Sequence, residues 1–327
     1  MISTDPAAAP ASVPDQLAAS HRLADRYGFI EAASTAGPRV RLRFATWNTS
    51  GTRRGTAVVL AGRGEFIEKY ATELMGELLD RGFDVQAMDW RGQGLSDRSL
   101  PDRHKGHIDD FATYVADLKL FLDRVVAPQA SGPVICISHS MGGHTVLRYL
   151  AEHGNGPLAA ALMTAPMNGL VRESILRIAL ALLPERPSIE TRYLYGSGPF
   201  TLIGREFAIN RLTHDERRFR FTDQWFAADP RLTLGGPTTG WARQAMRSMT
   251  LARQRGYLER IELPVMVLSA GQDRLVDRAT HPLTVARLKR GELVMLPDSR
   301  HEIMMETDAI RGRFWEAFDR LAKSLGV

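Results

Sequence analysis

The residues whose types and spacing can do chemistry begin with Ser140, which stands between an apolar run at 133–138 and a segment of helical period. Ser138 lies two residues before it and Gly142 two residues after it. A nucleophilic serine on a sharp strand-to-helix turn requires small residues at these positions, because the strand and helix backbones crowd there. The pattern therefore predicts a nucleophile at Ser140, although Ser138 replaces the glycine that usually comes first.

A serine hydroxyl is a poor nucleophile at neutral pH, so this prediction requires a base and an orienting carboxylate later in the chain. Asp273 and His301 each follow a predicted strand and meet the expected order of serine, acid and histidine. We predict that His301 takes the proton of Ser140 and that Asp273 orients the imidazole. Asp277 is a rival carboxylate that lies further from its strand end. A turn-capping aspartate and an ordinary surface histidine are the simpler alternatives.

Acyl chemistry on Ser140 also needs backbone amides directed at the oxygen that becomes negative during attack. The amide of Met141, the residue after the nucleophile, is the first expected donor. The second is expected from an early loop with the sequence Ala-Gly-Arg-Gly-Glu at 61–65, where we assign the amide of Arg63. A plain glycine turn is the alternative. A nucleotide-binding loop is disfavoured because Ile67 stands where the third small residue would be.

Several other polar residues have simpler interpretations. Two pairs of histidines lack a third residue at a spacing typical of metal ligands, so packing or solvent exposure is expected for them. These residues are His104, His107, His139 and His144. The segment 89–94, Asp-Trp-Arg-Gly-Gln-Gly, is expected to be a tight turn that shapes the site without reacting. The predicted chemistry requires no metal and no organic cofactor.

The elements that position these residues alternate between short apolar runs and longer segments of helical period. This alternation predicts an α/β fold with a mostly parallel sheet flanked by helices. The predicted strands are 40–46, 56–60, 84–89, 133–138, 159–164, 265–269 and 292–296. The predicted helices are 66–81, 108–126, 141–152, 281–289 and 308–324.

The alternation stops between Pro166 and Leu263, in a stretch of helical character that is too long for an ordinary connection. We interpret 167–263 as an inserted cap, and 21–166 together with 264–327 as the core. Residues 1–20 are rich in Ala, Pro and Ser and are interpreted as a flexible N-terminal extension.

Composition restricts the classes of function. The chain has 327 residues, 44% of them hydrophobic, and this allows one large core with an insertion. Cys136 is the single cysteine, which fits a reducing compartment, and no signal peptide is apparent, so the expected location is the cytoplasm. No apolar stretch approaches the roughly 20 residues that span a bilayer. The net charge is +5, but the arginines are dispersed and no nucleic-acid-binding motif accompanies them.

Taken together, several motifs resemble the monoacylglycerol lipase and lysophospholipase branch of the α/β-hydrolases, from about Arg39 to the last helix. The core motifs are Ala61-Gly62-Arg63-Gly64-Glu65, Asp89-Trp90-Arg91-Gly92-Gln93-Gly94, Gly106-His107-Ile108-Asp109-Asp110-Phe111, His139-Ser140-Met141-Gly142-Gly143, Ala165-Pro166-Met167 and His301-Glu302. Bacterial lysophospholipases are the nearer match because of two cap segments. These are Asn210-Arg211-Leu212-Thr213-His214, and Gly235-Gly236-Pro237-Thr238 followed by Trp241.

The resemblance implies a serine hydrolase that cleaves a carboxylic ester of a single-chain lipid, with a lysophospholipid as the expected substrate. A monoacylglycerol lipase and a general carboxylesterase are the alternatives within this class, and acyl transfer to another lipid sometimes accompanies hydrolysis in the family. Ala61 replaces the histidine that commonly begins the oxyanion loop of monoacylglycerol lipases. Like Ser138, this departure bears on substrate preference more than on catalysis.

The cap offers two features that suit a lipid. An apolar face can line an acyl tunnel or rest on a membrane, although packing on the core explains it equally well. Its residues are Ile175, Ile178, Ala179, Leu182 and Leu183. Four arginines can attract a phosphate headgroup or an anionic bilayer, and a solvated helix face is the alternative. They are Arg211, Arg217, Arg218 and Arg220. Peripheral contact with the inner face of the membrane is therefore a further expectation.

Two readings from other classes remain open. A serine aminopeptidase can share the fold and the triad, but it should present carboxylates to a substrate ammonium, whereas this cap is rich in arginine. A non-catalytic binding protein can retain the fold, but it has little need of a serine, an aspartate and a histidine in this order.

Overall fold

The computed structural model describes residues 2–3, 23–33, 39–71, 73–203 and 205–327. Their strands are β1 (Ile2–Ser3), β2 (Arg26–Ala32), β3 (Val40–Trp47), β4 (Gly55–Leu60), β5 (Phe83–Met88), β6 (Val134–His139), β7 (Leu158–Thr164), β8 (Val265–Ala270) and β9 (Gly291–Leu296). They form one sheet in the order β1-β2-β3-β5-β4-β6-β7-β8-β9. The strands from β5 to β9 in this order are parallel, and β1, β2 and β3 join antiparallel. The predicted α/β fold class is confirmed.

All seven predicted strands are present within a residue or two of their expected bounds. The parallel strands β4, β5, β6 and β8 are buried along their whole length. This explains the mainly apolar runs of β4, β6 and β8, whereas β5 buries Asp84 and Gln86 among its apolar residues. The strand β2 was not predicted, because Gly28 and Glu31 interrupt its apolar pattern. The predicted N-terminal extension, 1–20, lies outside the described residues except for β1.

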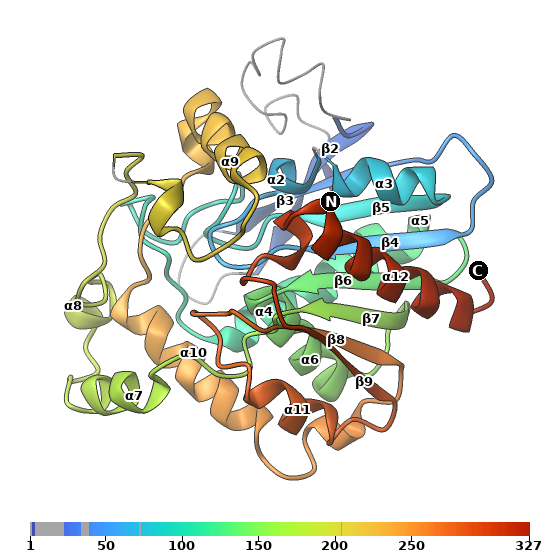
Figure 1. Cartoon of the computed structure of the whole chain (residues 1–327). Helices are drawn as coiled ribbons and strands as arrows, with labels where there is room; N and C mark the ends of the chain where they lie inside the picture. Colours follow the sequence, from blue (N-terminus) through green and yellow to red (C-terminus); the bar gives the residue numbers. More distant parts are fainter. Residues whose placement is uncertain (1, 4–22, 34–38, 72, 204) are drawn as a thin grey trace.

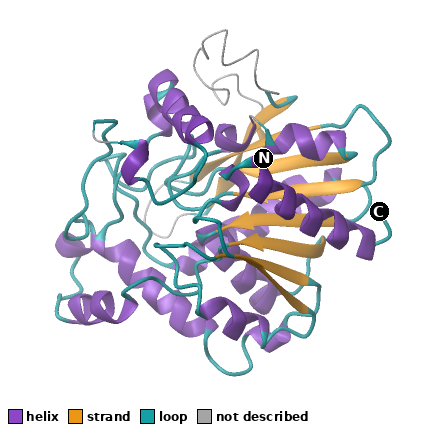
Figure 2. Ribbon diagram, in the orientation of Figure 1, coloured by secondary structure: helices purple, strands orange, loops and turns teal. Residues whose placement is uncertain are grey.

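Helices cover both faces of the sheet (Figures 1 and 2). One face packs against α2 (Ile67–Ala71), α3 (Leu74–Asp80) and α12 (Asp308–Ser324). The other packs against α4 (Phe111–Phe121), α6 (Met141–His153), α10 (Thr239–Ala252) and α11 (Thr280–Val285). The α/β layering therefore gives two hydrophobic cores, one on each side of the sheet.

Three of the five predicted helices differ in their bounds. The predicted helix 66–81 is divided into α2 and α3, and the division falls beside Glu73, whose φ of −129° is not helical. The predicted helix 108–126 begins later because the Asp110 side chain accepts from the Ala112 amide and caps α4. This helix continues through a π-helical turn at Leu122–Val126 and the short α5 (Ala127–Gln129). The helix expected at 281–289 is α11, which ends at Val285.

The described residues between β7 and β8 form helices and loops rather than sheet strands. The helices are α7 (Glu173–Ala181), α8 (Pro187–Glu190), α9 (Glu216–Ala228) and α10. Figure 1 shows α7, α8 and α9 beyond the carboxyl ends of the parallel strands. The inward face of α10 belongs to the core, where it packs beside α4 and α6. In the described part of the chain, no helix combines the length and apolar character needed to cross a membrane.

Candidate active site

Ser140 occupies a strained turn between β6 and α6. Its backbone has φ 49° and ψ −114°, a combination that residues other than glycine rarely adopt. The turn is crowded, because a Cβ atom placed on Gly142 would lie 2.5 Å from the carbonyl oxygen of Ala61. Ser138 is fully buried on the strand side of the turn. The small residues predicted on either side of Ser140 therefore occupy positions with little space for larger ones.

The structure brings the three predicted site side chains together. The Nε2 atom of His301 lies 3.1 Å from the Ser140 hydroxyl, and its Nδ1 atom lies 2.6 Å from a carboxylate oxygen of Asp273. Ser140 follows β6, Asp273 follows β8 and His301 follows β9, so three strand ends each supply one residue. This geometry allows the imidazole to accept the serine proton while the carboxylate holds the ring.

Asp273, rather than Asp277, faces the imidazole. The second carboxylate oxygen of Asp273 accepts hydrogen bonds from the amides of Leu275 and Val276, and the side chain is fully buried. The carboxylate of Asp277 accepts from the amide of Ala279 within its own turn. The structure thus separates two candidates that lie only four residues apart in the sequence.

The surroundings of this cluster determine its charges. Burial alone would raise the pKa of Asp273, but the interaction with His301 and two amide hydrogen bonds outweigh burial and hold this pKa below its ordinary value. His139 stacks beside His301 with ring centroids 4.6 Å apart. Burial lowers the pKa of His139 to about 4 despite the nearby Glu65 carboxylate. His139 is therefore neutral at pH 7 and does not oppose a positive charge on His301.

The glycine-containing loop after β4 passes close to the nucleophile, since a Cβ atom on Gly62 would lie 3.2 Å from that of Ser140. The Gly62 amide donates to the Glu65 carboxylate and the Gly64 amide donates to the side-chain oxygen of Gln93. The Arg63 amide lies between these two and donates to no other described residue. The loop thus fixes its flanking amides and leaves the Arg63 amide available for a ligand.

A buried ionic network includes Glu65 of this loop and stabilises the loop's position. The ammonium group of Lys69, only 3% exposed, lies 2.7 Å from carboxylate oxygens of both Glu65 and Glu302. The Tyr70 hydroxyl donates to Glu65 as well. Burial opposes ionisation of Glu65, but the interaction with Lys69 outweighs it and lowers the pKa of Glu65 to about 2. Because Glu302 follows His301, this network joins the loop after β4 to the loop after β9, which we call the histidine loop.

The histidine loop also holds the segment between β7 and β8. The Glu302 amide donates to the Leu212 carbonyl, and the Thr213 hydroxyl donates to the Met305 carbonyl at 2.7 Å. The His214 ring lies 2.8 Å from the Glu306 carboxylate. The motif at 210–214 therefore fixes the segment between β7 and β8 to the histidine loop. Sequence reasoning assigned no role to Lys69 or Glu302 and did not predict this attachment.

A cavity of about 320 Å³ lies over Ser140 and His301. Residues 62–65 of the loop after β4 form part of its polar wall, with Lys69, His139 and Glu302. Its apolar wall comes mainly from the segment between β7 and β8. That wall includes Met167, Leu170, Phe200, Leu212, Phe219, Phe226, Leu234 and Trp241. The cavity therefore combines a reactive polar floor with space for an apolar group.

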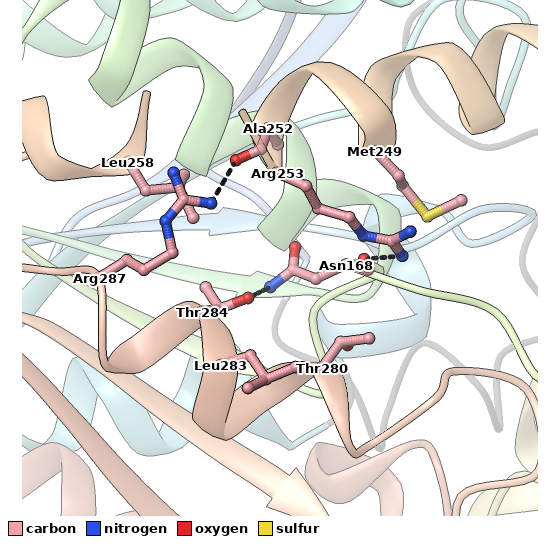
Figure 3. A pocket seen from close by; sticks show the side chains of 9 residues that line it. All are labelled: Asn168, Met249, Ala252, Arg253, Leu258, Thr280, Leu283, Thr284 and Arg287. Carbon is pink, nitrogen blue, oxygen red and sulfur yellow. Dashed lines mark hydrogen bonds between the residues drawn. The ribbon is translucent and has the colours of Figure 1, made fainter. Parts of the chain in front are cut away.

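A second cavity, of about 290 Å³, lies among α10, α11 and the segment that follows β7 (Figure 3). None of its lining residues is a serine, cysteine, histidine or carboxylate. Its two guanidinium groups are already bound, Arg253 to Glu173 and to the Asn168 carbonyl, and Arg287 to Glu259 and to the Ala252 carbonyl. This cavity lacks the groups for acyl chemistry.

The remaining polar motifs have structural partners. His104 accepts from the Phe200 amide, and His107 lies 2.8 Å from the Thr238 hydroxyl, so both contact the segment between β7 and β8. His144 is buried against the Ser248 hydroxyl at 2.7 Å. The Asp89 carboxylate binds Arg43 inside the core. Throughout the described ranges, no three His, Cys, Asp or Glu residues are grouped to hold a metal ion.

The structure gives different outcomes for the apolar face and for the four arginines predicted between β7 and β8. On α7, Ile175, Ile178 and Leu182 are 64–79% exposed, so this apolar face does not pack on the core. Of the four arginines, Arg218 is buried and binds Glu73, Asp215 and Asp308. Arg217 and Arg220 also have carboxylate partners, whereas Arg211 is exposed with none recorded among the described residues. Most of this arginine set is therefore paired with carboxylates rather than forming a free cationic patch.

Comparison with proteins of known sequence identifies a hydrolase family and two lysophospholipases among the relatives of this chain. A family model described as "Serine aminopeptidase, S33" matches residues 51–308. The chain is 33% identical over 293 residues to lysophospholipase L2 of Escherichia coli strain K12, covering 86% of this chain and 84% of that protein. It is 27% identical over 259 residues to a probable lysophospholipase L2 of Haemophilus influenzae, covering 79% and 80%.

Solved structures share the fold at lower identity. A soluble variant of monoglyceride lipase from Saccharomyces cerevisiae, in complex with a substrate analogue, superimposes with a TM-score of 0.69. It is 19% identical, and the match covers 91% of this chain and 96% of that chain. Monoacylglycerol lipase of Paleococcus ferrophilus gives a TM-score of 0.66 at 20% identity, with coverage of 86% and 98%.

Replacing Gly142 with alanine should lower ester turnover roughly 10- to 100-fold, because the new methyl group must force α6 away from the Ala61 and Leu60 carbonyls. Initial rates on a short chromogenic ester measure the effect. Gly312→Ala in α12 is the matched control, since a Cβ atom there has open space. Wild-type turnover in the Gly142→Ala variant would contradict this account of the turn.

Replacing Lys69 with methionine leaves two buried carboxylates without their cation and should lower the free energy of unfolding by about 3–5 kcal/mol. Urea denaturation followed by circular dichroism measures this change. In Lys119→Met, loss of an exposed pair with Asp123 should lower the free energy by less than about 1 kcal/mol. Equal losses in the two variants would show that the buried network has no special contribution.

Proposed function

Because the chain belongs to the α/β-hydrolase family and is a carboxylic ester hydrolase within it, we propose that it hydrolyses the acyl ester of lysophospholipids. The observation that carries the chemistry is the pair of contacts made by His301, at 3.1 Å to Ser140 and 2.6 Å to Asp273. The substrate class rests on the 33% identity to lysophospholipase L2 over most of both chains.

In the proposed mechanism, the Ser140 oxygen attacks the ester carbonyl while His301 takes the serine proton. Asp273 orients the imidazole and stabilises its positive charge. The amides of Met141 and Arg63 bind the oxygen that becomes negative, and the free Arg63 amide supports this assignment. His301 then donates its proton to the leaving alcohol. Water activated by His301 hydrolyses the acyl-enzyme and releases the fatty acid.

The cavity suits one acyl chain. Its volume of about 320 Å³ falls in the range of small-molecule sites, and most of its wall is apolar. We assign the segment 167–263 as a cap that roofs this cavity. Support comes from its contribution of Phe219, Phe226 and Trp241 to the wall and from its anchoring to the histidine loop. Exclusion of water by such a roof strengthens the polar interactions beneath it.

We further propose that the protein is cytoplasmic and that the exposed face of α7 makes peripheral contact with the inner face of an anionic membrane. Three large aliphatic side chains on one short helix form an apolar face, which can enter the boundary between headgroups and acyl chains. The arginines of α9 do not supply the attraction to anionic lipid, because carboxylates neutralise them. Arg172, at the start of α7, is exposed beside the apolar face.

Other activities fit the site less well. An aminopeptidase needs a free carboxylate for the substrate ammonium, but Lys69 holds both carboxylates that line the cavity, those of Glu65 and Glu302. A monoacylglycerol lipase or a general carboxylesterase requires the same chemistry and differs only in the alcohol that leaves. A non-catalytic binding protein has no need of the strained serine turn.

Wild-type protein should hydrolyse lysophospholipids with a higher kcat/KM than monoacylglycerols or short esters, when each is assayed below its critical micelle concentration.

Ser140→Ala should lower kcat by several orders of magnitude, roughly 10⁴-fold or more, because the nucleophile is lost. Fatty-acid release measured by mass spectrometry checks both expectations. Circular dichroism confirms folding of the variant. Preference for monoacylglycerol would replace the proposed substrate, and activity in Ser140→Ala would reject the nucleophile.

Introducing a charge on α7 should weaken membrane contact. In Ile178→Glu, the fraction of protein that co-sediments with phosphatidylglycerol vesicles should fall several-fold, because a carboxylate enters the lipid boundary unfavourably. Leu283→Glu is the matched control, since Leu283 is equally exposed on α11 but lies on another element. Equal sedimentation of wild type and both variants would remove the membrane contact from the proposal.

A further inference from the structure

The guanidinium group of Arg63 lies in a recess beside the active-site cavity. Its Nη2 atom donates to the Gly235 carbonyl at 2.7 Å, and the group lies 5.3 Å from the ring centre of Trp241. Gly106 makes room for it, because a Cβ atom at that position would lie 2.3 Å from the same nitrogen. The recess therefore holds a cation between the oxyanion loop and the cap.

This cation lacks a counter-charge in the described part of the chain. Arg63 forms no ion pair with another described residue, and its Nε atom is buried without a hydrogen-bond partner. Arg91 by contrast has Asp117 at 2.7 Å, and the half-buried Arg98, which also lacks a carboxylate partner among the described residues, donates to the carbonyls of Arg103, Arg231 and Thr233. Burial lowers the pKa of Arg63 to about 10, so the group is still charged at neutral pH. Arg63 is partly buried, so its unpaired charge is incompletely solvated, and a ligand anion in the recess would pair with it.

The other arginine of the cavity differs in this respect. Arg205 lies 2.7 Å from the Asp223 carboxylate and stacks among the rings of Phe200, Phe219 and Phe226. Its charge is already balanced within the cap. Arg63 and Arg205 line the same cavity, so they offer a comparison between an unpaired and a paired guanidinium.

We propose that the Arg63 side chain binds the phosphate of the substrate headgroup while the amide of the same residue binds the oxyanion. This inference rests on the proposed lysophospholipid activity and names the group that recognises the headgroup. In a lysophospholipid only the glycerol backbone separates the ester from the phosphate, and this separation suits the length of one arginine side chain. A guanidinium matches a phosphate with charge-assisted hydrogen bonds, whereas a monoacylglycerol leaves the cation unpaired.

Two measurements on Arg63→Met test this subsite. The first is the ratio of kcat/KM for a lysophospholipid to kcat/KM for the monoacylglycerol with the same acyl chain, which should fall about tenfold or more. The second is competitive inhibition by sn-glycerol 3-phosphate during hydrolysis of p-nitrophenyl butyrate. Its inhibition constant should rise about tenfold or more in the variant, while glycerol inhibits neither protein appreciably.

Arg205→Met is the matched control and should keep both the wild-type ratio and the wild-type inhibition constant. Arg63→Lys retains the charge, so both quantities should lie nearer wild type than those of Arg63→Met. An unchanged ratio and inhibition constant in Arg63→Met, or equal changes in Arg205→Met, would overturn the subsite. The inhibition measurement does not use lysophospholipid. Failure of wild type to hydrolyse lysophospholipids would therefore reject the proposed function, while the inhibition result still decides the subsite.

Discussion

The strained turn at Ser140 is the constraint on which the geometry of the site depends. Ser140 adopts φ 49° and ψ −114°, and two residues later Gly142 lets α6 approach the Ala61 carbonyl closely. The same approach fixes the loop after β4 against the nucleophile, since β4 and β6 are neighbours in the sheet. Backbone strain at one residue and the absence of a side chain at another thus place the serine and the loop amides in one arrangement.

The second constraint is electrostatic. Lys69 joins two carboxylates from loops that are far apart in the sequence, and all three groups are buried. Desolvating them is unfavourable, and their mutual attraction offsets this only when the geometry is well defined. The network therefore favours one arrangement of the loop after β4 relative to His301. Through the Glu302 amide and the Leu212 carbonyl, the same arrangement extends to the segment between β7 and β8.

The sequence predicted those features that depend on local pattern. The strands before Ser140 and Asp273 are buried and mainly apolar, and β9 before His301 is a less buried, mainly apolar strand. The turns after these strands revealed the three residues, whose catalytic roles stay predictions. Features that depend on pairing across the chain were missed or left open. Glu65 and Lys69 have the spacing of a surface helix pair, and nothing local links them to Glu302. Likewise, Arg218 is typical of a solvated helix, yet it is buried among three carboxylates from separate elements.

The attachment of the segment between β7 and β8 explains which side of α7 is exposed. The segment is fixed to the core at 210–214 and near Gly235, and α10 packs within the core. The inner side of α7 is held by the buried Leu180 and by the ion pair of Glu173 with Arg253, so its outer side, with Ile175 and Ile178, is the exposed one. Leu170 lines the cavity, and Val171, which is 45% exposed, leads directly towards α7. The apolar lining of the cavity and the exposed apolar side of α7 thus come from neighbouring stretches of one segment, with Arg172 and Glu173 between them. In the proposed function, this arrangement keeps the membrane contact of α7 and the cavity for the acyl chain close together in the sequence.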